Sequence, residues 1–132
     1  MQRVTPVESY RVYSEHYGAG DPVVLLHGLS GSQRWWRYTV PALAREYEVH
    51  VLDLVGHGRS RRAPRQPTIP EMAALVRAWI ERIGIDRPHL VGHSMGGQIA
   101  IHIAAGDLAL RSLTLVDAAG LPRRVTLREI TR

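Results

Sequence analysis

The feature of the sequence that most constrains its fold is a serine flanked by glycines, placed between a strand-like and a helix-like segment. PHLVG at residues 88–92 is short and apolar, as in a strand, whereas SMGGQIAIHIAA at residues 94–105 has helical character. The junction, GHSMG at residues 92–96, fits the pattern Gly-x-Ser-x-Gly. A tight strand-to-helix turn strains the serine backbone, exposes its hydroxyl and leaves no room for side chains two residues either side. The pattern therefore predicts a sharp turn that presents Ser94.

Other segments continue the alternation of strands and helices. Strands are expected at residues 10–17, a half-buried edge region, and at 23–28 and 47–54, and a further strand with its exit loop is expected within 110–120. Helical spacing of apolar residues begins at Ser32, and Pro41 marks a kink or a new helical start. Short strands that alternate with helices are typical of a parallel sheet with crossover helices. We therefore predict one α/β domain, residues 1–132, with a mostly parallel central sheet.

The clearest predicted helix spans residues 69–83. Its apolar residues fall on one stripe, at positions 72, 75, 76, 79, 80 and 83. Thr68 and Glu71 have capping-box spacing at its start, and Gly84 stands where a left-handed residue would end it. Apolar burial also leads us to expect the tryptophans in the core.

Composition indicates a globular protein without a membrane span. The chain has 132 residues, of which 45% are hydrophobic and none is cysteine. It contains no apolar run of the 18 or more residues that a span requires, and the N-terminal segment lacks the apolar core of a secretory signal. We expect a cytoplasmic location and no membrane partner. All 17 basic residues are arginine, a bias that suggests a GC-rich, bacterial coding sequence.

The formal net charge of +5 does not by itself indicate a nucleic-acid partner. Most arginines stand singly, and no aromatic side chains interleave with the clustered ones to stack on bases. A solvated basic loop explains these clusters, so no nucleic-acid partner is expected. The clustered arginines are Arg59, Arg61, Arg62 and Arg65 in one loop and Arg123 and Arg124 near the end.

Two backbone amides are candidates to stabilise an oxyanion beside Ser94. The helix that follows the serine points its free N–H groups toward it, with the Met95 amide first in line. The stretch LLHGLSGS at residues 25–32 follows an earlier strand. Carboxyl ends of parallel strands share one edge of a sheet, so the Leu29 amide is expected to face the same spot. Together the two amides would make an oxyanion hole.

With these motifs the chain resembles the N-terminal portion of an α/β-hydrolase-fold enzyme of the serine-nucleophile branch. The resemblance lies in HGLSGS at residues 27–32, DLVGHGRS at 53–60, GHSMGG at 92–97 and LTLVDAAG at 113–120. It implies Ser94 as nucleophile, with the amides of Leu29 and Met95 as the oxyanion hole. A serine at this turn resembles the esterase, lipase, lactonase, perhydrolase and carbon-carbon-bond hydrolase branches. The dehalogenase and epoxide-hydrolase branches carry aspartate there and are set aside.

The sequence departs from the family in its missing triad partners. The family's acid and histidine follow the serine in the order Ser, Asp or Glu, His. The sequence given ends at Arg132, so the resemblance implies a fold truncated before the cap and C-terminal strands. Only His102 follows Ser94, and a helical rise of about 1.5 Å per residue puts it about 12 Å along the axis. It is therefore too far away to be the base.

Other histidines and aspartates are candidates for the missing roles. His27 and His57 belong to turn motifs in which the family uses histidine structurally, so a base role is the minor interpretation. Asp117 ends the last strand and is the candidate acid if a histidine comes from elsewhere. Asp53 is interpreted as a residue that fixes a loop.

Residues near the predicted turn could also contact a substrate. Gly28, Leu29, His93 and Trp35 are the candidates for this contact, although packing explains His93 and Trp35 as well. The histidines show no metal-ligand spacing such as His-Glu-x-x-His, so no metal site is expected. No cofactor is implied.

Two classes of function follow from the sequence. The first is a serine hydrolase that acts on an ester-like or related carbonyl small molecule through an acyl-enzyme on Ser94, and that is inactive or weak as this chain. The second is a non-catalytic binding or oligomerisation module. Its open strand SLTLVD, residues 112–117, would pair with another copy or a partner chain. A split hydrolase, with a partner chain supplying acid and histidine, is a variant of the first.

Overall fold

A computed structural model describes residues 1–60, 63 and 65–120. Arg61, Arg62, Arg123 and Arg124, which belong to the clustered arginines, lie outside these residues. The strands are β1 (Gln2–Val7), β2 (Tyr10–Tyr17), β3 (Asp21–Leu26), β4 (Tyr47–Leu52), β5 (His89–His93) and β6 (Ser112–Val116). The helical elements are η1 (Gln33–Trp36), α1 (Val40–Leu43), η2 (Gly58–Ser60), α2 (Ile69–Ile83) and α3 (Met95–Ala104).

Within the described part of the chain the strands form one sheet in the order β1-β2-β4-β3-β5-β6. The pairs β4 with β3, β3 with β5, and β5 with β6 are parallel. β1 and β2 form an antiparallel hairpin, and β2 pairs antiparallel with β4. The predicted α/β class with a mostly parallel central sheet is therefore confirmed.

The edge position predicted for residues 10–17 is wrong, because β1 pairs outside β2. The pattern of β1 is weak, since only Thr5 and Val7 in it are buried. Pro6 has no backbone N–H to donate, which suits a strand with one unpaired side. At the other edge lies β6, with Leu113 and Val116 each 39% exposed. The open edge predicted for that strand is present among the described residues.

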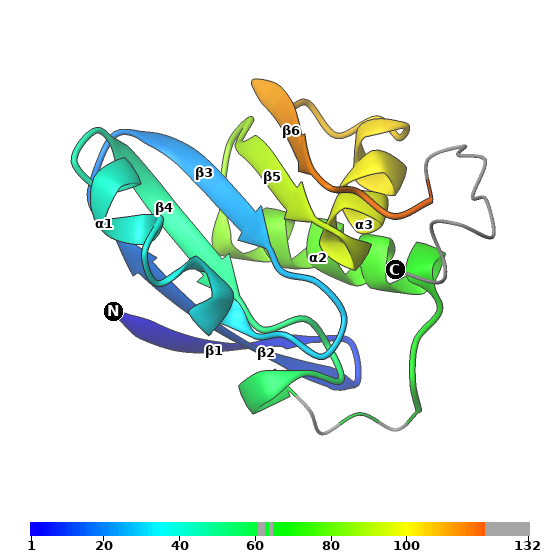
Figure 1. Cartoon of the computed structure of the whole chain (residues 1–132). Helices are drawn as coiled ribbons and strands as arrows, with labels where there is room; N and C mark the ends of the chain where they lie inside the picture. The colour runs from blue at the N-terminus through cyan, green and yellow to red at the C-terminus, as the bar shows by residue number, and fades with distance from the viewer. Residues whose placement is uncertain (61–62, 64, 121–132) are drawn as a thin grey trace, which may run out of the picture.

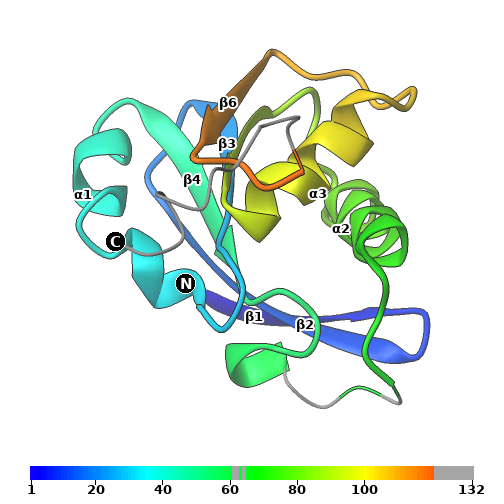
Figure 2. The same cartoon turned by 45° about the vertical axis from the view of Figure 1, so that its right-hand side comes forward.

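Helices cover both faces of the sheet, with α2 and α3 on one side and α1 on the other (Figures 1 and 2). Alternate residues of β3 face opposite sides of the sheet. Val24 and Leu26 pack in the core beneath α2 and α3, whereas Val23 and Leu25 pack with Trp36 on the opposite face. Because side chains alternate along a strand, a continuous apolar run is what a strand buried on both faces requires.

The local signals of α2 are confirmed. Thr68 accepts a hydrogen bond from the Glu71 amide, the Glu71 side chain bonds back, and Gly84 has φ +80°. The helix expected from Ser32 is instead two short pieces, η1 and α1, and Pro41 lies in the first turn of α1 as a new helical start. Among the described residues, no helix combines the length and apolar character needed to cross a bilayer.

Candidate active site

Ser94 occupies the predicted turn between β5 and α3. Its backbone has φ +52° and ψ −115°, a conformation that costs a non-glycine residue about 1–3 kcal/mol. Tertiary contacts hold it there. The Ser94 amide donates to the Val116 carbonyl at 3.0 Å, and the Ser94 carbonyl accepts from the Ala119 amide at 2.9 Å. The end of β6 and the residues that follow it therefore help to fix the serine in its strained conformation.

The glycines two residues before and after Ser94 stand where there is no room for a side chain. A Cβ built on Gly92 would lie 2.4 Å from the Gly96 carbonyl oxygen. One built on Gly96 would lie 2.4 Å from the carbonyl oxygens of both Leu26 and His27. The close approach of α3 to β5 explains the glycine at position 92, and the close approach of α3 to the end of β3 explains the glycine at position 96.

The loop after β3 comes directly against the turn. A Cβ on Gly28 would lie 3.2 Å from the Ser94 Cβ and 3.2 Å from the His93 Nδ1, so the chain before Leu29 is packed on the serine. Among the residues that the structure describes, neither the Leu29 amide nor the Met95 amide donates to a backbone carbonyl. No bond to a described backbone carbonyl therefore excludes either amide as the predicted oxyanion donor.

His27 is a structural residue. Its Nε2 accepts a hydrogen bond from the Leu54 amide at 3.0 Å, so Nδ1 carries the proton and donates to the Gly28 carbonyl at 2.7 Å. The side chain is fully buried, and this burial lowers the pKa of His27 below its usual range. Both ring nitrogens are occupied, and the neutral ring ties β3 to the loop after β4. A base role for His27 would break both bonds.

The buried histidines predict that the protein loses stability in mild acid. Burial lowers the pKa of both His27 and His50, whereas in the unfolded chain a histidine titrates near 6.5. The unfolded chain therefore binds protons that the folded chain does not. This stability is fully present above about pH 6.5 and falls as the pH drops, by at most about 1.4 kcal/mol per pH unit for each histidine.

Urea unfolding between pH 7.5 and 5.5 measures this slope. We expect His27→Gln to unfold at lower urea but with a shallower pH dependence than the wild type. His102→Gln, an exposed position in the last turn of α3, is the control and keeps the wild-type slope. An unchanged slope in His27→Gln would show that His27 is not the buried neutral group described here.

Asp53 fixes two loops, as predicted. It is 2% exposed, and its two carboxylate oxygens accept from the Gln33 amide at 2.7 Å and the Arg59 amide at 2.9 Å. His57 lies in the same turn, buried, with its Nδ1 3.3 Å from the Val55 carbonyl oxygen. These contacts give both residues a role in loop structure.

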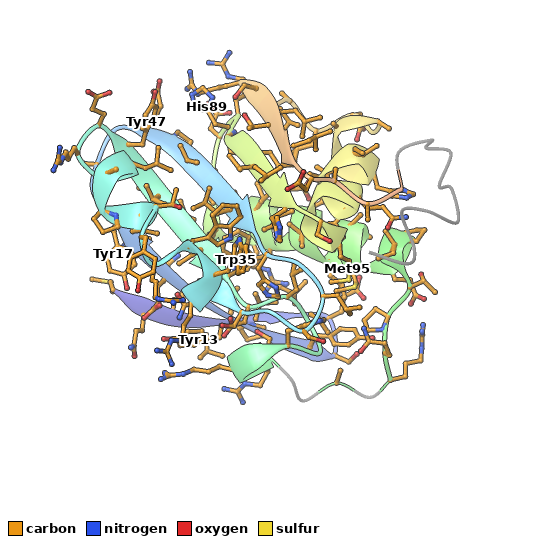
Figure 3. The ribbon with its side chains drawn as sticks, in the orientation of Figure 1. Tyr13, Tyr17, Trp35, Tyr47, His89 and Met95 are labelled. Carbon is orange, nitrogen blue, oxygen red and sulfur yellow. The ribbon has the colours of Figure 1, made fainter. Side chains whose placement is uncertain are left out.

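The four predicted substrate-contact positions come together beside Ser94. Trp35 stacks on His93 with the ring centroids 4.6 Å apart and the planes 16° apart, and Gly28 packs against the same imidazole. Leu29 is 70% exposed. Figure 3 labels Trp35 in η1 and Met95 in α3, near the carboxyl ends of the central strands. The expectation that the tryptophans lie in the core holds for Trp36 and Trp79 but is wrong for Trp35, which is 55% exposed.

Asp117 remains a candidate acid. It follows β6 directly, is exposed and has φ +46°. Among the described residues no hydrogen bond joins it to a histidine.

Three contacts of the site had no signal in the sequence: the hydrogen bond from the Leu54 amide to His27, the hydrogen bond from the Gln33 amide to Asp53, and the stack of Trp35 on His93. Each joins residues far apart in the chain.

A mostly parallel sheet with a strained serine between strand and helix defines a recognisable class of α/β protein. The chain belongs to the alpha/beta hydrolase fold family, whose model matches residues 21–129. The chain covers only part of the length of its relatives, which agrees with the N-terminal portion that the motifs indicate.

Two curated relatives illustrate the range of the family. The chain is 40% identical over 103 residues to the dihydrolipoyllysine-residue acetyltransferase component of an acetoin cleaving system from Pseudomonas putida, across 77% of this chain and 28% of that protein. It is 36% identical over 117 residues to a soluble epoxide hydrolase from a Corynebacterium species, across 87% of this chain and 41% of that protein.

Solved structures share the same arrangement. A membrane phospholipase A, described as a bacterial virulence factor, matches with a TM-score of 0.90 and 30% identity over 96% of this chain and 42% of that chain. An N-acyl homoserine lactone degrading enzyme matches with a TM-score of 0.82 and 28% identity over 88% and 45%. The chain thus spans less than half the length of these four relatives.

Proposed function

We propose that the protein is a serine hydrolase that acts on an ester-like or related carbonyl substrate. The Ser94 Oγ attacks the carbonyl carbon, its proton leaves with the alcohol group, and water then hydrolyses the acyl ester on Ser94. The amides of Leu29 and Met95 would stabilise the negative oxygen of each tetrahedral intermediate. The substrate is a small molecule.

One observation carries this proposal: Ser94 stands at φ +52° beside two amides that donate to no described backbone carbonyl. A strained non-glycine backbone persists where the surroundings impose it, and such strain clusters at functional sites. A serine forms an acyl ester from a carbonyl substrate, which favours esters and lactones over epoxides as substrates. Of the relatives reported above, those named as a phospholipase and a lactone-degrading enzyme agree with this preference, whereas the one named as an epoxide hydrolase does not.

The proton acceptor for Ser94 is proposed to come from outside this chain. His27 has both ring nitrogens occupied, and His102 lies at the far end of α3. The chain therefore has a nucleophile and oxyanion donors but is expected to turn over slowly on its own. In a well-studied serine protease, such a partial site retains about 10³ to 10⁴ of the acceleration over water.

Hydrolysis of p-nitrophenyl acetate tests the proposal. We expect slow release of p-nitrophenol above the buffer rate together with an acetyl group on Ser94, detected by mass spectrometry. Ser94→Ala should gain no acetyl group and keep only the residual rate that the oxyanion amides and binding provide. His102→Ala, exposed and eight residues along α3, is the matched control and should keep the wild-type rate. Acetylation that persists in Ser94→Ala, or a wild-type protein that gains no acetyl group, would refute Ser94 as nucleophile.

A second function is favoured by the open edge of β6. Leu113 and Val116 are partly exposed there, and an unpaired edge strand is a template for pairing with another chain. The chain would then act as a binding or oligomerisation module, or as one half of a split hydrolase. Light scattering distinguishes these functions: a stable monomer contradicts pairing through β6, and a dimer without esterase activity supports it.

A further inference from the structure

We propose that Trp35, held flat against His93, forms the wall that binds the acyl group of the substrate and selects aromatic acyl groups over short ones. The inference rests on the proposed function, because it assigns a substrate class to the same site. Trp35 would contact the bound acyl group and would take no part in the bond changes at Ser94.

The position of Trp35 differs from that of the other tryptophans. Trp36 and Trp79 are 6% and 0% exposed, whereas Trp35 is 55% exposed although one face of its indole is covered by His93. A large aromatic surface left open to water costs free energy that a bound apolar group would recover. The open surface of Trp35 is therefore suited to a ligand.

The indole is fixed next to the nucleophile. His93 immediately precedes Ser94 in the chain, and its imidazole stacks on the indole of Trp35 with the ring centroids 4.6 Å apart. The segment that bears Trp35 is held at its start, where the Ser32 hydroxyl accepts from the Arg34 amide and the Asp53 carboxylate accepts from the Gln33 amide. The wall is thus in place before a substrate arrives, so little ordering of side chains opposes binding.

The flat shape of this wall determines what it binds well. Aromatic rings prefer offset-stacked or edge-to-face contact with an indole, a gain that comes in addition to burial of apolar area. The His93 Nδ1 is buried, and Gly28 packs against that edge of the ring, so this polar atom does not face a ligand. The part of the stack that is open to a ligand is therefore the exposed indole of Trp35. A methyl group would touch too little of it to benefit.

Boronic acids test the inference without need of a fast base. A boronic acid adds to the Ser94 hydroxyl as a tetrahedral boronate, forming the Oγ–B bond and releasing one proton to the buffer. Because adduct formation is an equilibrium, the affinity can be measured even where turnover is slow. Phenylboronic and methylboronic acids are titrated by boron NMR against wild type, Ser94→Ala, Trp35→Ala, Trp35→Phe and Tyr38→Ala.

We expect Trp35→Ala to reduce the ratio of phenyl to methyl affinity by about 3- to 10-fold. Trp35→Phe keeps a flat ring and should retain the ratio within about 2-fold, as should Tyr38→Ala, an aromatic position in the same segment that is 82% exposed. Suppose that the ratio of phenyl to methyl affinity is unchanged in Trp35→Ala while Ser94→Ala still loses binding. This result would refute the role of Trp35 in binding the acyl group but would leave Ser94 as the nucleophile. Binding that survives in Ser94→Ala, or wild type that forms no adduct, would count against the proposed function itself.

Discussion

Replacing Gly96 by alanine is expected to destabilise the protein by about 3 kcal/mol or more. The new Cβ would lie 2.4 Å from the carbonyl oxygens of Leu26 and His27, which belong to the backbone at the end of β3. Backbone in a central strand cannot move aside without loss of its hydrogen bonds. Helix propensity acts in the opposite direction, since alanine favours an α-helix by about 1 kcal/mol over glycine. The steric term wins, because α3 must move away from β3.

Urea unfolding followed by circular dichroism measures this effect. Gly106→Ala is the matched control, because a Cβ there would meet the Ile103 carbonyl oxygen at an ordinary 3.4 Å. We expect Gly106→Ala to stay within about 1 kcal/mol of the wild type. A Gly96→Ala protein as stable as the wild type would show that α3 does not approach β3 as closely as described.

Asp53→Ala is the second substitution with a large expected effect, a loss of about 3–4 kcal/mol. It removes two charge-assisted hydrogen bonds and leaves the amides of Gln33 and Arg59 without their partner. Hydrogen bonds to charged groups contribute about 1.5–3 kcal/mol each, and unpaired donors that stay partly buried add to the loss. The segment that carries Trp35 would also lose its attachment at Gln33.

The midpoint of thermal unfolding checks this prediction. Asp53→Asn keeps an acceptor oxygen and should recover part of the loss. Asp86→Ala is the control. The Asp86 side chain is 83% exposed, and its ion pair with Arg87 is loose, with 3.8 Å between Oδ2 and Nε. This substitution should change stability by less than about 0.5 kcal/mol. Equal effects of Asp53→Ala and Asp86→Ala would contradict the role assigned to Asp53.

Features that are encoded locally could be predicted from the sequence. The stripe, capping box and terminal glycine of α2 lie within a few residues of one another, and all are present. The turn at Ser94 follows in the same way from Gly92 and Gly96. The parallel sheet could be predicted because its buried strands are continuous apolar runs.

Features that depend on distant partners could not be predicted. β1 shows almost no pattern, because its outer position leaves only two residues buried, and pairing with β2 decides its conformation. The helical periodicity after Ser32 came from residues of η1, α1 and the start of β4, and Pro41 limits how far a helix can extend before it. Trp35 and His93 are 58 residues apart, so their stack has no local signal.

The parallel pairing of β3 with β5 also determines when the serine can take up its final conformation. Leu26 pairs with Gly92, 66 residues later, and the Ser94 backbone is bonded to Val116 and Ala119. Closing so long a loop costs entropy before any contact repays it. During synthesis the backbone bonds that hold Ser94 cannot all form until Ala119, 25 residues later, has also been made. A nascent chain on the ribosome carries Ser94 in an unstrained form until about the last of these residues has emerged.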